Sequence, residues 1–254
     1  MAKVLILGGT TEARQLAERL AQRAGLDVML SLAGRTASPV PHAVPIRVGG
    51  FGGAEGLADH LAGEHVDALI DATHPYANII SENAAAAARK AAVPFVALRR
   101  PPWSAVPGDR WIEVSDAGPA VDAIGQECRN VFVAVGRNEL APFTSAPQHR
   151  YLIRSVDPVD PSLSLPLATY IAARGPFSEA NDRALMTQHK IEVVISKNSG
   201  GSAAYGKIAA ARALGIEVIM LRRRPAPDAP SVDTIEDALA WLDHALTSTA
   251  ARGV

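Results

Sequence analysis

Short runs of apolar residues alternate with amphipathic stretches along the first half of the chain. These strand-like runs, rich in apolar residues, cover residues 4–7, 28–32, 46–48, 68–70 and 95–98. Stretches with helical periodicity lie between them, at residues 11–23, 54–63 and 79–91. Strands that read as continuous apolar runs are buried on both faces. Their alternation with helices predicts a parallel sheet with right-handed crossovers.

The second half of the chain repeats this layout. Residues 131–135 form another apolar run, and the spacing after it, Gly136, Asn138, Ala141, copies Gly8, Thr10, Ala13. Four further pairs of similar segments follow in the same order: "VGGF" and "RGPF", "ALIDATHPYA" and "VVISKNSGGS", "VPFVALRRP" and "IEVIMLRRRP", "VSDAGPAVDAI" and "VDTIEDALAWL". Similar segments at similar intervals indicate an internal repeat.

We therefore predict an α/β fold of two Rossmann-like parallel-sheet domains that are related by this repeat. The boundary is expected near Cys128, with one domain over residues 1–127 and the other over residues 128–254. One long doubly wound sheet would produce a similar alternation of strands and helices, and it is the alternative fold.

Composition narrows the classes of function. The chain has 254 residues, a formal net charge of −1 and a single cysteine. This charge argues against a dedicated nucleic-acid binder, and one cysteine excludes an intrachain disulfide and a thiolate metal cluster. The chain runs straight into a strand without a targeting signal, and it lacks the run of about 18 apolar residues that a membrane span needs. We expect a cytoplasmic protein with no nucleic-acid or membrane partner.

The first apolar run ends in the turn Gly8-Gly9-Thr10-Thr11, directly before a predicted helix. Ligands of open α/β sheets bind beyond the carboxyl ends of the strands, where the free N–H groups of a helix N-terminus suit a phosphate. The turn departs from the dinucleotide fingerprint G-x-G-x-x-G, because Thr10 replaces the middle glycine and Ala13 the third. Two interpretations stay open: a pyrophosphate site, or a turn capped by Thr10 or Thr11.

The end of the second strand bears on the cofactor. NAD enzymes usually place an acidic residue there to hold the ribose 2′-hydroxyl. The segment here reads Ser31-Leu32-Ala33-Gly34-Arg35 and carries no acid. A carboxylate would repel a 2′-phosphate, whereas Ser31 and Arg35 can bind one. If a dinucleotide binds, this segment favours NADPH; the alternative interpretation is an ordinary surface arginine.

The segment "DATHPYAN", residues 71–78, ends a buried strand and enters a helix. His74 can donate a proton or bond a carboxamide, and Tyr76 can stack on a ring. Pro75 suits a turn or a first helical position. The alternative is a capping turn in which Thr73 is satisfied locally. We expect a functional role, because this loop should adjoin the first glycine turn.

The second half places cations and polar groups at its predicted strand ends. These are Arg137, Arg174, Lys197, Asn198 and Ser199, followed by Gly200 and Gly201. The segment "KNSGG" can form an anion-binding nest. Arg137 occupies the position of Gly9 in the repeat, which disfavours a second dinucleotide and favours a ligand that bears carboxylates. We interpret Arg222, Arg223 and Arg224 as surface charge.

Taken together and in this order, "GGTTEAR", "DATHPYA", "RGPF" and "KNSGG" resemble the precorrin-6A reductase family of cobalamin biosynthesis, over about residues 3–245. The resemblance implies an NADPH-dependent reduction of one carbon–carbon double bond of precorrin-6A, a tetrapyrrole (corrin-ring precursor), to precorrin-6B. It also implies that NADPH lies against the first of two Rossmann-like domains and the macrocycle in the cleft between them. Tyr76 stands where the family also uses phenylalanine. No metal is required, because the ring system is already electron-poor.

The resemblance assigns roles residue by residue. The pyrophosphate would contact Gly8, Gly9, Thr10 and Thr11, and the adenosine 2′-phosphate Ser31, Gly34 and Arg35. The nicotinamide would lie near Thr73, His74, Pro75 and Tyr76, with His74 and Tyr76 as catalytic candidates. The substrate would contact Arg137, Arg174, Lys197, Asn198 and Ser199. Transient contacts with neighbouring pathway enzymes are a further expectation.

Three alternatives stay open. The substrate is the cobalt complex of precorrin-6A instead of the metal-free ring; the chain is a non-enzymatic NADP sensor; or it is a corrin-pathway methyltransferase. The segment 31–35 argues against the S-adenosylmethionine site that a methyltransferase needs. The proton donor is not identified by the sequence.

Overall fold

The computed structural model describes residues 1–34, 41–159 and 163–252. The chain divides into two compact units: unit 1 is Met1–Pro101 with Arg224–Val254, and unit 2 is Pro102–Arg223. Each unit contains one six-stranded sheet, and all neighbouring strands in both sheets are parallel. The prediction of two Rossmann-like parallel-sheet domains is confirmed, and the alternative of one long sheet is wrong.

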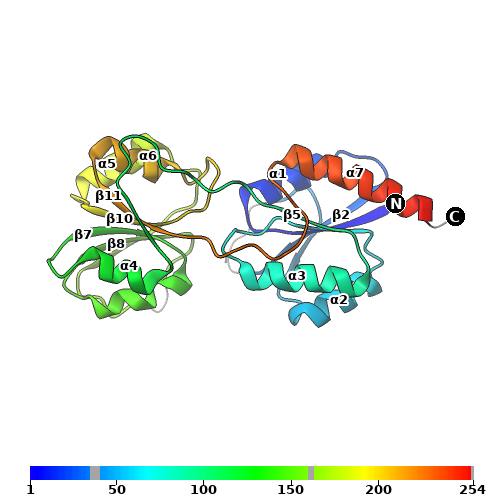
Figure 1. Cartoon of the computed structure of the whole chain (residues 1–254), viewed down its shortest axis with the longest axis horizontal. Coiled ribbons are helices and arrows are strands. Elements are labelled where there is room, and N and C mark those ends of the chain that lie inside the picture. The colour runs from blue at the N-terminus through cyan, green and yellow to red at the C-terminus, as the bar shows by residue number, and fades with distance from the viewer. Residues whose placement is uncertain (35–40, 160–162, 253–254) are drawn as a thin grey trace. The chain divides into compact units, whose positions relative to one another are not determined.

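The sheet of unit 1 has the strand order β12-β5-β4-β1-β2-β3. Helices α1 and α7 cover one face of this sheet, and α2 and α3 cover the other (Figure 1). The elements of unit 1 are β1 (Ala2–Leu7), α1 (Thr11–Leu20), β2 (Leu26–Leu32), β3 (Ile46–Val48), α2 (Gly53–Gly63), β4 (Ala68–Asp71), α3 (Asn78–Ala91), β5 (Phe95–Leu98), β12 (Ser231–Val232) and α7 (Ile235–Arg252).

Strand β1 shows why these strands read as continuous apolar runs. Val4 and Ile6 pack into the core beneath α1 and α7, whereas Leu5 and Leu7 pack into the core beneath α2 and α3. Successive side chains of a strand point to opposite faces, so a strand covered on both sides needs an apolar residue at every position.

The sheet of unit 2 has the strand order β6-β11-β10-β7-β8-β9. Helices α5 and α6 pack together on one face over Phe132, Val194 and Val218, and α4 lies on the other face (Figure 1). The elements of unit 2 are β6 (Trp111–Val114), α4 (Ala117–Ile124), β7 (Asn130–Ala134), the 3-10 helices η1 (Arg137–Glu139) and η2 (Ala141–Ser145), β8 (Arg150–Ser155), β9 (Ala168–Ala172), α5 (Glu179–Gln188), β10 (Val193–Lys197), α6 (Gly206–Leu214) and β11 (Glu217–Leu221).

The division into units differs from the predicted boundary between residues 127 and 128. Strand β6 follows β5 along the chain, but it pairs with β11 in unit 2. Strand β12 follows β11, but it pairs with β5 in unit 1. Each half of the repeat therefore gives its last strand and helix to the other unit, and the chain crosses between the units twice. Equivalent strands of the repeat hold equivalent places in the two sheets.

Candidate functional site

A pocket opens in unit 1 at the carboxyl ends of β1, β2, β3 and β4, with a volume of about 180 Å³. Of the predicted cofactor residues, Gly8, Ser31 and Thr73 line it. The complete lining is Leu7, Gly8, Ser31, Ala33, Gly49, Gly50, Phe51, Gly52, Gly53, Leu57, Thr73, Ile80 and Asn83. The structure therefore brings the ends of three predicted segments together at one edge of the sheet.

The turn after β1 is a capped strand-to-helix turn. Thr10 is the N-cap of α1, and its Oγ1 accepts a hydrogen bond from the Ala13 N–H at 3.1 Å. The same hydroxyl donates to the carbonyl oxygen of Ala72 at 2.8 Å. Because the proton of Thr10 is used within the fold, a bound anion at this turn depends on backbone N–H groups of the first helical turn.

Gly8 and Gly9 are needed in this turn for different reasons. A Cβ at Gly8 would lie 2.5 Å from Cδ1 of the buried Leu30, so the backbone packs directly on the β2 side chain. Gly9 has φ 114°, in the region that favours glycine, and a Cβ there would meet nothing within 4 Å. Gly8 is thus required because its backbone packs directly on Leu30, whereas glycine is favoured at Gly9 because of the positive φ of the turn.

Glu12 lies in the first turn of α1 and carries a negative charge where a phosphate would bind. Its carboxylate pairs with the Arg100 guanidinium, and both side chains are largely buried. Desolvation lowers the pKa of Arg100, and the charge of Glu12 and its hydrogen bond oppose that shift. The ion pair offsets the charge of Glu12, so the N-terminus of α1 keeps its attraction for anions.

The end of β2 contributes Ser31, which is buried, and Gly34, which has φ 71°. The Ser31 carbonyl accepts from the Gly8 N–H at 2.9 Å and so ties the two strand ends together. Arg35, the predicted 2′-phosphate ligand, lies outside the described residues.

The loop "GGFGG", residues 49–53, is a part of the pocket that the sequence analysis missed. Gly49, Gly52 and Gly53 all have positive φ, and Gly52 caps α2 without a side-chain hydrogen bond. Arg47 holds the loop: its Nη1 donates to the Gly49 carbonyl at 2.7 Å, and its guanidinium lies 3.8 Å from the Phe51 ring centroid. A glycine cluster between a strand and a helix is itself a signal that could have found this loop.

The loop after β4 is fixed by a buried carboxylate. Asp71 accepts from the Thr73 N–H at 3.0 Å and the Thr73 hydroxyl at 2.6 Å, and its other oxygen lies 3.5 Å from Arg99 Nη2. The alternative interpretation, in which Thr73 is satisfied locally, is therefore correct for its hydroxyl. Thr73 still lines the pocket, so it can meet a ligand through its remaining surface.

His74 and Tyr76 lie in one turn, and Tyr76 comes two residues before Asn78, where α3 begins. The Tyr76 N–H donates to Nδ1 of His74 at 3.3 Å, and the two ring centroids lie 5.7 Å apart. In a neutral ring this bond places the His74 proton on Nε2, where it can be donated. Pro75 lies inside the turn, and α3 begins only at Asn78. Pro75 is therefore a turn residue instead of a first helical residue.

The predicted substrate residues of unit 2 gather at the carboxyl end of its sheet. Arg137 follows β7 and Arg174 follows β9, and both side chains are exposed. Lys197 ends β10, and its Nζ lies 2.5 Å from Oε1 of Glu139. Gly136 leaves room for this ion pair, because a Cβ there would lie against both partners.

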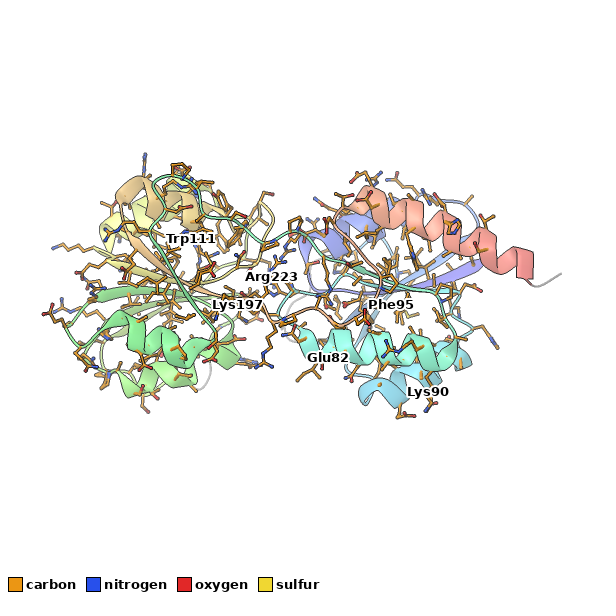
Figure 2. All side chains as sticks on the ribbon, in the orientation of Figure 1. Glu82, Lys90, Phe95, Trp111, Lys197 and Arg223 are labelled. Carbon is orange, nitrogen blue, oxygen red and sulfur yellow. The ribbon has the colours of Figure 1, made fainter. Side chains whose placement is uncertain are left out.

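Asn198 and Ser199 are buried, although both were predicted to meet substrate. The Asn198 side chain accepts from the Trp103 N–H at 2.7 Å and donates to the Trp103 carbonyl at 2.8 Å. Arg223 is partly buried, and its Nε donates to the Asn198 carbonyl at 2.7 Å. Lys197 and Arg223 are labelled in Figure 2. Arg223 thus contacts the loop after β10, whereas the sequence analysis interpreted it as surface charge. The sequence analysis did not identify Trp103 as a residue of this site.

Within residues 1–34, 41–159 and 163–252, no group of three or more His, Cys, Asp or Glu side chains is arranged to hold a metal ion. The helices in these ranges include none that is long and apolar enough to cross a membrane.

The model of one protein family, described as precorrin-6x reductase CbiJ/CobK, matches residues 3–243. The chain belongs to this family. A precorrin-6A reductase of Sinorhizobium sp. is 55% identical over 95% of this chain and 93% of its own length. A cobalt-precorrin-6A reductase of Priestia megaterium is 29% identical over 96% of this chain and 98% of its own length.

A solved structure, named CobK precorrin-6A reductase, has a TM-score of 0.93 and 45% sequence identity to this chain. It covers 96% of this chain and 97% of its own. The similarity to the precorrin-6x reductase family therefore extends over both units and confirms the family that the four sequence motifs indicated.

Proposed function

We propose that this chain uses NADPH to reduce one carbon–carbon double bond of precorrin-6A, giving the dihydro product precorrin-6B in cobalamin biosynthesis. Membership of the precorrin-6x reductase family makes the chain an oxidoreductase that acts on a CH–CH group. The observation that carries the cofactor assignment is the glycine-rich pocket at the carboxyl ends of β1–β4. In open α/β sheets this edge is where nucleotides bind.

The residues at this edge fit a dinucleotide phosphate. Gly8, Gly9, Thr10 and Thr11 would hold the pyrophosphate at the N-terminus of α1, and the loop 49–53 adds a second glycine-rich edge to the pocket. Ser31, Gly34 and Arg35 would hold the 2′-phosphate, and Thr73, His74, Pro75 and Tyr76 would lie by the nicotinamide. When bound, NADPH supplies the hydride; the chain positions it and excludes competing reactions.

Unit 2 would hold the substrate through its cations. Precorrin-6A carries several acetate and propionate groups, and we assign Arg137, Arg174, Lys197, Asn198 and Ser199 to their recognition. Lys197 is already paired with Glu139, so a substrate carboxylate would compete with that side chain. Guanidinium groups bind carboxylates with two parallel hydrogen bonds, which suits the two exposed arginines for orienting the ring.

His74 and Tyr76 are the catalytic candidates that the chain offers. The reduction adds hydride to one carbon and a proton to its neighbour. His74 carries its proton on Nε2 when its ring is neutral and Nδ1 accepts from Tyr76. Its task would be to hold or donate that proton, while the loop fixed by Asp71 keeps the ring in place.

An anaerobic assay tests the proposal. NADPH consumption is followed with precorrin-6A and with its cobalt complex, in parallel reactions. We expect turnover of the metal-free ring, because identity is higher to the relative named for that substrate. Faster turnover of the cobalt complex would favour the other pathway branch. Binding of NADPH without its oxidation would favour a sensor.

A cytoplasmic location and transient contacts with neighbouring pathway enzymes stay predictions from the sequence.

A further inference from the structure

Trp103 lies in the segment between the start of unit 2 and β6, far along the chain from the loop it contacts. Its backbone N–H and carbonyl bind the two ends of the Asn198 amide, at 2.7 and 2.8 Å. Its indole Nε1–H donates to the Gly201 carbonyl at 2.8 Å. One residue therefore makes three hydrogen bonds to the segment 198–201.

The indole ring also contacts residues at the start of α6. The Tyr205 ring lies edge-on at 5.5 Å between centroids, and Nζ of the buried Lys207 lies 5.1 Å from the indole centroid. Lys207 in turn donates to the Ala204 carbonyl at 2.7 Å. Trp103 thus contacts both the loop 197–201 and the start of the helix that follows it.

The loop 197–201 needs such restraint from outside its own backbone. Gly200 and Gly201 have φ 65° and 70°, and two consecutive glycines give a backbone with much conformational freedom. Lys197, Asn198 and Ser199 precede them and are assigned to the substrate. Holding several ligand groups in one geometry before binding lowers the entropy lost on binding. The hydrogen bond to Gly201 and the pair to Asn198 restrain the loop at both of its ends.

We propose that Trp103 is a positioning residue, which holds the loop 197–201 in the conformation that binds the carboxylates of the tetrapyrrole. Asn198 then acts mainly through Trp103, and Lys197 and Ser199 are the loop residues that meet the ligand. This inference rests on the proposed function of unit 2. It predicts that loss of the indole N–H weakens the use of substrate and leaves the use of NADPH unchanged.

The test compares two identical substitutions, Trp103→Phe and Trp111→Phe. Trp111, in β6, packs against the core of unit 2, and its buried Nε1 has no hydrogen-bond partner among the described residues. It is labelled in Figure 2. Both variants keep an aromatic ring and the backbone hydrogen bonds, but only Trp103→Phe removes an N–H that is in use. Trp111→Phe therefore controls for the general effect of shortening a tryptophan.

Each variant is tested by steady-state kinetics, amide hydrogen exchange and thermal unfolding. We expect Trp103→Phe to raise the KM for precorrin-6A roughly fivefold, the effect of one lost hydrogen bond, with kcat and the KM for NADPH near those of Trp111→Phe. We also expect faster amide hydrogen exchange in Trp103→Phe over the peptide of residues 198–205. In Trp111→Phe, exchange of the same peptide should stay as in the wild type. We expect thermal unfolding to show that both variants are folded.

The outcomes separate this inference from the proposed function. Unchanged exchange over residues 198–205 in Trp103→Phe overturns the positioning role, whether or not the enzyme turns over. Equal increases in the KM for NADPH and for substrate also overturn it. If the wild-type chain consumes no NADPH with either form of precorrin-6A, the proposed function fails, and the exchange experiment still decides whether Trp103 holds the loop.

Discussion

The turn after β1 and the turn after β7 hold the same place in the two halves of the repeat, but they lead into different structures. After Gly8 and Gly9 the chain enters α1, a helix of 10 residues capped by Thr10. After Gly136 it enters η1, a 3-10 helix of 3 residues with no side-chain cap. Only the first turn therefore provides a long helix N-terminus and its attraction for a phosphate.

The space at the second turn is used for charged side chains. The Lys197–Glu139 ion pair lies against Gly136, and Arg137 points to solvent. In the proposed function, the same supersecondary position would serve phosphate through backbone N–H groups in unit 1 and carboxylates through side chains in unit 2. On that proposal, the element that follows the turn would define the ligand, and the shared strand-and-turn scaffold would not. The following experiments test this difference.

The largest expected effect concerns one basic residue in each unit. Arg100 in unit 1 is largely buried and paired with the Glu12 carboxylate, whereas the buried Lys207 in unit 2 donates only to a carbonyl among the hydrogen bonds described for it. Burial, and secondly the charge of Arg154, lower the pKa of Lys207 from 10.5 to about 7, against the opposing charge of Asp182.

Between these two pKa values the unfolded chain binds a proton that the folded chain lacks. The free energy of unfolding should therefore rise from pH 7 to pH 9, by up to about 1.4 kcal/mol per pH unit, and this gain is lost as the pH falls through 7. Lys207→Met should remove the rise in urea denaturation, whereas Lys190→Met, at an exposed site, should keep it. An equal slope in both variants would contradict the prediction.

Arg35→Ala tests the phosphate preference of unit 1. A charge-assisted hydrogen bond to the 2′-phosphate contributes about 1.5–3 kcal/mol, so the KM for NADPH should rise about 10- to 100-fold. NADH lacks this phosphate, and its use should barely change, which makes it the internal control. Wild-type enzyme that uses both cofactors equally well would show that the segment 31–35 does not recognise the phosphate.

The pair Gly8→Ala and Gly136→Ala compares the two turns directly. At Gly8 the new Cβ meets the buried Leu30, and overpacking of this kind costs about 1–3 kcal/mol. We expect a lower Tm and a higher KM for NADPH. At Gly136 the Cβ displaces the partly exposed Glu139, so the KM for precorrin-6A should change while that for NADPH does not. The same cofactor defect in both variants would mean that the turns are not specialised.

Glu139→Gln should have the smallest effect. The side chains of Lys197 and Glu139 are 13% and 31% exposed, and partly exposed ion pairs contribute up to about 1 kcal/mol. Without the competing carboxylate, Lys197 should bind substrate more tightly, and the KM for precorrin-6A should fall about two- to fivefold. Glu179→Gln, at an exposed carboxylate of the same unit, is the matched control. A raised KM in Glu139→Gln would show that Glu139 holds Lys197 in place for the substrate.

Much of the site could be predicted because its signals are local. Thr10 follows the last strand residue by three positions and caps the helix that begins next to it. Gly8, Ser31 and Thr73 each come at or just after the end of a β-strand, and parallel strands bring such ends to one edge. The loop 49–53 was missed because its segment was read only as a repeat of "RGPF", although its glycines precede a helix in the same way.

The roles of Trp103, Asn198 and Arg223 could not be predicted, because their partners are distant in sequence. Asn198 is polar and follows a strand, which indicates a ligand contact. Its amide instead binds a backbone 95 residues away. Arg223 comes shortly after Leu221, the last residue of β11, and the sequence predicts an exposed charge there. Only the tertiary structure shows that its Nε donates to the Asn198 carbonyl in the loop after β10.

The sequence by itself determined the two parallel sheets and the glycine turns, because strand and helix periodicity and capping depend on residues that are near one another in the chain. Only the tertiary structure decided that β6 and β12 exchange units. Strand pairing joins residues of any sequence separation, and the short segments of β6 and β12, four and two residues long, do not by themselves specify the sheet edge that they join. The boundary between residues 127 and 128 followed the repeat, whereas the packing followed the pairing of β6 with β11 and of β12 with β5.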